Sequence, residues 1–274
     1  MNTQINRLTM PELPALADVL GEIGAHAWLV QLTAAMGQAA DRANLLLQPY
    51  HLLDLFPLLY WLKQNKLVPR GIELFMGNNL GYFGPYAESL RYGSERGHSW
   101  AGCGAGRWSL GIEADGSVKG CPSLPSLPYA VGKVQEFSIE EIHRMGQLTS
   151  NIPQGMEHLW GFCRTCPNAE RCRGGCTWTT HVLMGRPGNN PYCHYRALEL
   201  QKRGLRERIQ RVKQAPGLPF DHGQFELVTE PIESLDDELE SPVPMSYLAR
   251  LFDLVPQAKS LWPEDSVARA LQRH

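Results

Sequence analysis

The sequence lacks the features that mark several common classes of protein. No apolar run reaches the roughly 18 residues that a membrane-spanning helix needs. The N-terminal segment has neither the basic stretch nor the unbroken apolar stretch of a secretory signal. The net charge is only −2, which gives no reason to expect a nucleic acid or a membrane surface as a partner. We therefore expect a cytoplasmic globular protein in a reducing compartment.

Cysteine is absent from the first 102 residues and then occurs seven times. Four cysteines form the run CRTCPNAERCRGGC at residues 163–176, with the spacing C-x2-C-x5-C-x3-C. Upstream, Cys103 and Cys121 flank a segment with a hairpin turn signal, Asp115-Gly116, which predicts that the two cysteines lie near each other. Thiolates that converge in this way can hold a metal ion or a cluster.

Three hypotheses compete for these thiols. The odd count and the reducing compartment argue against a disulfide framework. Structural zinc would use four thiolates in a closed tetrahedral site, which would leave three of the seven cysteines without a role. Iron–sulfur clusters accommodate both a set of four and a set of three, because a cubane can be held by three cysteines with one iron open. The spacing favours iron–sulfur clusters and leaves zinc as the alternative.

The complete pattern is C-x12-G-x4-C, then C-x2-C-x5-C-x3-C, then a final cysteine. It resembles the SPASM domain, the auxiliary-cluster module at the C-terminus of many radical SAM enzymes. The resemblance implies two [4Fe-4S] clusters. The first would be held by Cys103, Cys121 and Cys176, and the second by Cys163, Cys166, Cys172 and Cys193. No eighth cysteine precedes the first, so one iron is expected to be open to a substrate, a water or a side chain such as His98.

The segments before the cysteines predict alternating helices and strands. The pattern predicts helices at 10–24 and 49–67, with a possible kink at Pro57, and strands at 27–35 and 71–79. This order implies parallel crossovers, and it resembles the last part of the partial (β/α)6 barrel of radical SAM enzymes. The resemblance places Gln31, Asn78 and Asn79 where that family contacts SAM and substrate. The alternative is that these side chains only satisfy backbone groups at the ends of strands.

We therefore expect an α/β fold with three parts. Residues 1–95 are expected to be the C-terminal part of a partial (β/α)6 TIM-like barrel, and residues 96–215 a small SPASM iron–sulfur domain made of a β-hairpin plus helices. Residues 216–274 are expected to be a linker and a helical C-terminal tail. Within the second part, residues 138–148 and 195–213 predict helices, the first opened by a capping box. His181 and His194 lie near cysteines and are weaker candidates as metal ligands.

The catalytic motif of the radical SAM family, C-x3-C-x2-C, is missing from this sequence. The resemblance thus implies a chain that does not cleave SAM alone and uses SAM only with a missing N-terminal half. That half would be lost by truncation or a misplaced start, or supplied by a second chain. The expected partners are a complementary chain with the radical SAM cluster, a peptide substrate, and an electron donor or acceptor protein. The alternatives are a non-catalytic iron–sulfur module for electron transfer or peptide binding, and a structural zinc protein.

Overall fold

The computed structural model of the chain describes residues 1–92, 100, 102–145, 148, 155–218 and 221–232. The fold of this part is mixed α/β, as predicted, with one parallel sheet and two antiparallel ones. The described residues do not form a barrel. No helix among them is both long and apolar enough to cross a membrane.

The N-terminal part is built on a parallel sheet with the strand order β1-β2-β3. Its elements are β1 (Asn2–Ile5), η1 (Met10–Glu12), α1 (Leu13–Glu22), β2 (Ala27–Leu32), α2 (Gln38–Asp41), η2 (Ala43–Leu45), η3 (Pro49–His51), α3 (Leu52–Leu62), η4 (Lys63–Leu67), η5 (Val68–Arg70), β3 (Glu73–Met76) and α4 (Ala87–Tyr92). The predicted helices and strands of this part are confirmed, and the first helix starts with a 3-10 turn. α3 runs through Pro57 without a break in the helix.

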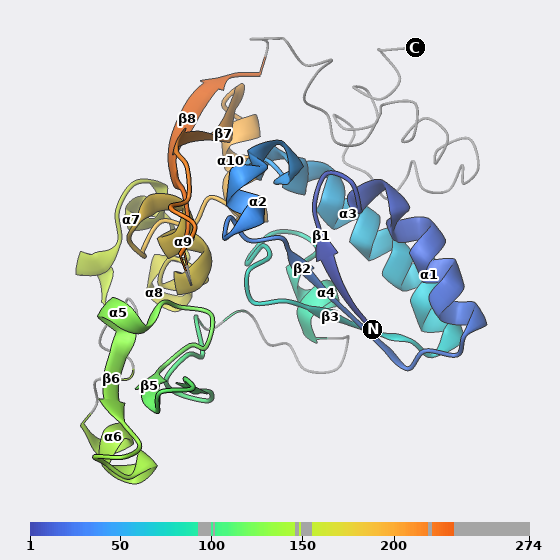
Figure 1. Ribbon diagram of the computed structural model, residues 1–274. Helices are drawn as coiled ribbons and strands as arrows, with labels where there is room; N and C mark the ends of the chain where they lie inside the picture. The colour runs from blue at the N-terminus through green and yellow to red at the C-terminus, as the bar shows by residue number, and fades with distance from the viewer. Residues whose placement is uncertain (93–99, 101, 146–147, 149–154, 219–220, 233–274) are drawn as a thin grey trace.

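The parallel sheet buries one face completely. Along β2, Trp28, Val30 and Leu32 are buried and alternate with half-buried residues. The buried side chains pack into one apolar core with residues of α1 and α3, which lie together on one side of the sheet (Figure 1). α3 is apolar on almost every side because it lies between the sheet and α10 (His194–Gln201). The sheet is thereby fixed to the segment that carries the last cysteine.

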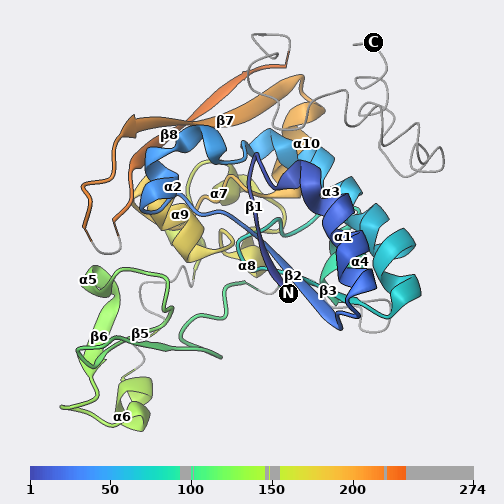
Figure 2. The same cartoon turned by 45° about the vertical axis from the view of Figure 1, so that its right-hand side comes forward.

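A second, antiparallel sheet has the order β4-β5-β6. Its elements are β4 (Gly111–Ile112), β5 (Ser117–Lys119), α5 (Ser126–Tyr129), β6 (Ala130–Lys133) and α6 (Ile139–Arg144). The predicted hairpin is confirmed: Gly116 has a φ of 81°, and the Asp115 carboxylate accepts hydrogen bonds from the Ser117 N–H and hydroxyl. The predicted capping box of α6 is also confirmed, with Ser138 and Glu141 bonded reciprocally. This sheet projects from the body, with α6 at its far end (Figures 1 and 2).

The remaining elements surround the later cysteines. They are η7 (Met156–His158), α7 (Phe162–Thr165), α8 (Ala169–Cys172), α9 (Thr177–Met184), α10, β7 (Leu205–Lys213) and β8 (Gln224–Pro231). β7 and β8 pair as an antiparallel ribbon in contact with α10 and α9, respectively (Figure 2).

The prediction of one helix over residues 195–213 is wrong in its second half. α10 ends at Gln201, Gly204 takes the left-handed conformation with a φ of 69°, and the basic run becomes strand β7. Glu207 and Ile209 are both buried on the same face of this strand. The helical pattern misled because β8 supplies the pairing that makes a strand favourable here. β8 also falls within residues 216–274, which were predicted to be a linker and helices; the helices predicted in its later part lie outside the described residues.

Two buried hydrogen-bonding groups join the ribbon and the cysteine region to the N-terminal part. The Gln48 side chain accepts a hydrogen bond from the Ile209 N–H at 2.7 Å and donates one to the Ile209 carbonyl at 3.3 Å. The Tyr192 hydroxyl donates to the Leu47 carbonyl at 2.6 Å. The segment just before Cys193 is therefore positioned by the sheet region.

Candidate functional site

All seven cysteines lie in the described part of the chain, and all are free thiols. Helix ends and loops carry them: Cys163 lies in α7, Cys172 ends α8, and Cys176 and Cys193 precede α9 and α10. Between Cys172 and Cys176 the backbone turns through three consecutive left-handed residues, Arg173, Gly174 and Gly175. Glycine is required at the last position, where a Cβ would lie 2.5 Å from the Tyr82 ring.

Three of the thiols influence one another across a wide separation in sequence. Burial raises the pKa of Cys176 to about 12, and the nearby thiols of Cys103 and Cys121 raise it further. Burial likewise raises the pKa of Cys121, with a contribution from Cys103. We call Cys103, Cys121 and Cys176 the three-cysteine group. The small antiparallel sheet and the start of α9 bring it together.

The other four thiols form a second set. Burial raises the pKa of Cys172 strongly, and the thiols of Cys193 and Cys163 add to the rise. Burial raises the pKa of Cys163 to about 11, again with a contribution from Cys193. We call Cys163, Cys166, Cys172 and Cys193 the four-cysteine group. The structure thus brings together the same two sets that the sequence resemblance implies.

Hydrogen-bond donors point at these sulfurs. The N–H groups of Thr179, Gly175 and Arg196 lower the pKa of Cys176, Cys172 and Cys193, respectively, against the larger effect of burial. The N–H groups of Asn190, Asn168 and Ser123 act in the same way on Cys163, Cys166 and Cys121. Donors of this kind stabilise thiolates more than thiols. The surroundings therefore suit sulfurs that are ligands.

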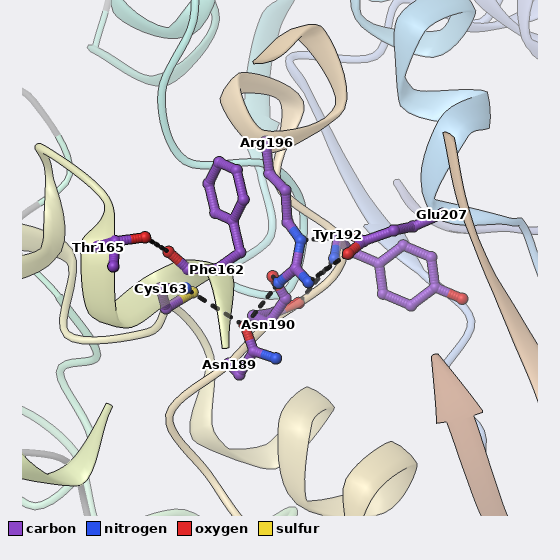
Figure 3. Close-up of polar contacts among 8 residues, drawn as sticks. All are labelled: Phe162, Cys163, Thr165, Asn189, Asn190, Tyr192, Arg196 and Glu207. Atoms are coloured by element: carbon purple, nitrogen blue, oxygen red, sulfur yellow. Dashed lines mark hydrogen bonds and ion pairs between the residues drawn. The ribbon is translucent and has the colours of Figure 1, made fainter. Parts of the chain in front are cut away.

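A buried ion pair lies beside the four-cysteine group. Arg196, 2% exposed, donates two hydrogen bonds of 2.6 and 2.7 Å to the carboxylate of Glu207 on β7. Figure 3 shows its guanidinium also reaching the Asn189 side chain at 2.7 Å and the Asn190 carbonyl at 3.3 Å. Asn189 in turn accepts a hydrogen bond from the Cys163 N–H. The cation lowers the pKa values of Cys163, Cys166 and Cys193, opposing the larger effect of burial.

The donor set fits an iron–sulfur cluster in its chemistry. Thiolates are the ligands that such clusters use, and hydrogen bonds to the sulfurs and low solvent exposure are the features that set their potentials. No three His, Cys, Asp or Glu side chains in the described ranges gather closely enough to hold a single metal ion. The fit therefore rests on the identity, grouping and hydrogen bonding of the seven thiols.

The three predicted polar ligands have different surroundings. Asn79 is buried, and its side-chain amide accepts from the Leu32 N–H at 3.1 Å and donates to the Leu32 carbonyl at 2.8 Å. These bonds cap the end of β2 and favour the structural alternative for this residue. Gln31 is half-buried on β2 and Asn78 is exposed. A role for any of them in binding SAM or substrate stays a prediction.

The histidines near the cysteines also differ. His194 is buried between the rings of Phe56 and Tyr86, and among the described residues neither of its ring nitrogens has a hydrogen-bond partner. The Nδ1 of His181 lies 3.0 Å from the Tyr129 hydroxyl, so His181 ties α9 to the small sheet. His98 lies outside the described residues.

Three residues around the thiols were not anticipated as part of the site: Tyr82, Asn190 and Arg196. Tyr82 lies in the aromatic loop that precedes α4, and its hydroxyl contacts the backbone of Cys176. The sequence offered a signal for Asn190, because paired asparagines between glycine and proline mark a specific turn. It offered none for Arg196, whose counter-ion comes from a strand predicted to be helix.

The comparisons with known proteins are limited. No protein-family model matches the chain, and no curated protein matches it. One solved structure, a histidine-tagged anSMEcpe with bound AdoMet, is similar with a TM-score of 0.43 and 17% sequence identity. The similarity covers 72% of this chain and 50% of the other, so this chain spans about half the length of that protein. An identity and a TM-score this low assign no function to this chain.

Proposed function

We propose that this chain is an iron–sulfur protein that holds two auxiliary [4Fe-4S] clusters as the SPASM portion of a radical SAM enzyme that modifies peptides or proteins. The observation that carries the proposal is the gathering of seven thiols into a set of three and a set of four. The sequence motif that resembles the SPASM domain contains these same thiols.

The proposed ligands are the two cysteine groups as defined above. Clusters of this kind transfer single electrons. The chain's own residues lower the cost of holding several negative sulfurs in a buried place: the N–H groups donate to the thiolates, and the Arg196 cation offsets the charge of the four-cysteine group. Tyr82 and Trp100 pack directly against Cys172, Cys176 and Cys193 and exclude water from that side.

The first test is the metal content of the protein. We expect anaerobically purified or reconstituted chain to be brown, to absorb broadly near 400 nm, and to carry about eight irons and eight inorganic sulfides, as two cubanes require. Colourless protein with stoichiometric zinc would contradict the proposal and support a structural zinc protein instead.

Cysteine variants make this test specific to each group. Cys172→Ala should remove the cluster of the four-cysteine group and about half of the iron, and Cys103→Ala should weaken or remove the other half. Thr165→Ala is the matched control, because its exposed hydroxyl lies between two cysteines and only donates a 3.4 Å hydrogen bond to the Phe162 carbonyl. Equal iron contents in all three variants would contradict the assignment of ligands.

The radical chemistry of such an enzyme requires a partner in this proposal. The sequence has no C-x3-C-x2-C motif, so a complementary chain would bind SAM and make the radical, while this chain binds a peptide and exchanges electrons. We expect the reconstituted chain alone to make no 5′-deoxyadenosine from SAM under reducing conditions, and to co-purify with a chain that carries that motif. Production of 5′-deoxyadenosine by this chain alone would contradict this part of the proposal.

The same missing motif favours a second candidate function, a non-catalytic iron–sulfur module for electron transfer or peptide binding. Both candidates predict the same iron content. They differ in whether the protein co-purifies from its source cells with a radical SAM chain and stimulates that chain's turnover. Reversible reduction by an electron-carrier protein, without any such partner, would favour the module.

A further inference from the structure

Tyr82 occupies an unusual position between the two cysteine groups. Its side chain is 1% exposed, and it packs in one buried cluster with Cys172, Cys176, Cys193 and Trp100. Its hydroxyl oxygen accepts two hydrogen bonds of 2.9 Å, one from the Cys176 N–H and one from the Asn190 side-chain amide. A phenol oxygen that accepts twice still has its own proton to donate.

The direction of these hydrogen bonds is fixed by the neighbouring groups. A backbone N–H can only donate, so Cys176 is a donor to Tyr82. The Asn190 side-chain oxygen accepts from the Tyr192 N–H at 2.9 Å, which turns the Asn190 amide nitrogen toward Tyr82. Within the described ranges no oxygen or nitrogen acceptor faces the Tyr82 proton. Buried hydroxyl protons are nearly always hydrogen-bonded in folded proteins.

The nearby acceptors of suitable chemistry are sulfurs. Burial raises the pKa of Tyr82, and the thiols of Cys176 and then Cys172 raise it further, which places both sulfurs close to the hydroxyl. A thiol is a weak acceptor, whereas a thiolate is a strong one. The ring cannot swing away, because it packs on Trp100 at a centroid distance of 5.0 Å and on Gly175.

We propose that Tyr82 donates its hydroxyl hydrogen bond to the Cys176 thiolate when the three-cysteine group holds its cluster, and that this bond raises the reduction potential of that cluster. The inference rests on the proposed function. Reduction adds negative charge to a cluster and its ligands, and a hydrogen bond to a ligand sulfur stabilises that charge. Tyr82 is thus a positioning and tuning residue, since it acts on the cluster through a ligand.

The test is the midpoint potential of each cluster in the reconstituted full chain, followed by EPR during redox titration, with the signals assigned from the Cys103→Ala and Cys172→Ala proteins. In Tyr82→Phe we expect the potential of the three-cysteine cluster to become more negative and that of the four-cysteine cluster to stay within error. Tyr195→Phe is the matched control, because Tyr195 packs at the edge of the same cluster of side chains and is only partly buried. It should move neither potential.

A second protein separates hydrogen-bond strength from structural damage. Incorporation of 2,3-difluorotyrosine at position 82 keeps the shape of the side chain and makes its hydroxyl a stronger donor, so the potential of the three-cysteine cluster should become more positive. The inference is overturned if the two proteins shift that potential in the same direction, or if neither shifts it, or if both clusters move equally. Absence of iron from the wild-type protein would contradict the proposed function instead.

Discussion

The two cysteine groups are stabilised in different ways. The four-cysteine group lies within residues 163–193 and has a buried cation, Arg196, beside it. The three-cysteine group is assembled from residues far apart in the chain, and hydrogen-bond donors surround its most buried member, Cys176. The comparison teaches that charge compensation at the first group depends on one ion pair, whereas the second depends on how the small sheet, α9 and the loop before α4 are held together.

The largest effect should come from breaking the ion pair. Arg196→Met leaves the Glu207 carboxylate buried without its partner, which typically costs 3–5 kcal/mol, so we expect a loss of about that size in the free energy of unfolding. It should also remove the iron of the four-cysteine group before that of the other. Anaerobic urea denaturation and iron analysis measure both.

Lys202→Met is the control for this prediction, because it removes an exposed ion pair with Glu199 on the same helix end. It should change neither iron content nor stability measurably. If Arg196→Met lost iron equally from both groups, the difference in charge compensation would be disproved.

Gly175→Ala should affect both groups, because this residue lies between Cys172 and Cys176. The new methyl group would meet the Tyr82 ring at 2.5 Å, and the residue would have to keep a φ of 74°. Gly185→Ala is a close control: its φ is 70°, but nothing lies within 4 Å of its Cβ. The left-handed conformation alone costs about 1–2 kcal/mol. We expect both variants to melt at lower temperature, and only Gly175→Ala to lose iron.

A smaller, pH-dependent effect should appear at the attachment of the small sheet. Burial, with a contribution from the nearby His222, lowers the pKa of His181 from 6.5 to about 4. Between these values the unfolded chain binds more protons than the folded chain, so stability is retained above about pH 6.5 and is lost as the pH falls toward 4. The melting temperature of His181→Asn should fall less over this range than that of the wild type.

His158→Asn is the control for the pH experiment, since His158 is exposed and contacts Glu157 at the surface. Its melting temperature should follow the wild-type curve. Identical curves for all three proteins would show that His181 carries no pH dependence.

The smallest effect should come from the far end of the small sheet. Ser138→Ala removes the N-cap of α6 and should destabilise the protein by about 0.5–1 kcal/mol, measured by urea denaturation. Because α6 projects away from the cysteines, iron content should not change. A loss of iron from the three-cysteine group in this variant would mean that the whole small sheet is coupled to the site.

The sequence predicted the elements whose signals are local. The hairpin at Asp115-Gly116, the capped helix α6 and the apolar helix α3 all depend on residues within a few positions of one another. β1 and β7 depend on pairing with distant strands, so a polar four-residue strand and a basic run gave no clear signal. The division of the thiols was implied by a resemblance rather than by the spacing alone.

The site was predictable to the level of its sulfurs but not of their surroundings. Cysteine spacing carries chemical information in the sequence itself. The contributions of Tyr82 and Arg196 arise only when segments about 90 residues apart in one case, and a strand beyond the last cysteine in the other, come into contact. Nothing in the local pattern of either residue specifies such a partner.

The position of Glu207 on β7 has a consequence for the order of assembly. Its carboxylate is the counter-ion of Arg196, yet it lies after every cysteine in the chain. A nascent chain that has just exposed Cys193 therefore has all its sulfurs but not the charge balance beside them. We expect stable loading of metal to await synthesis of the β7–β8 ribbon, so the smallest autonomous cluster-binding unit ends at Pro231 rather than at the last ligand.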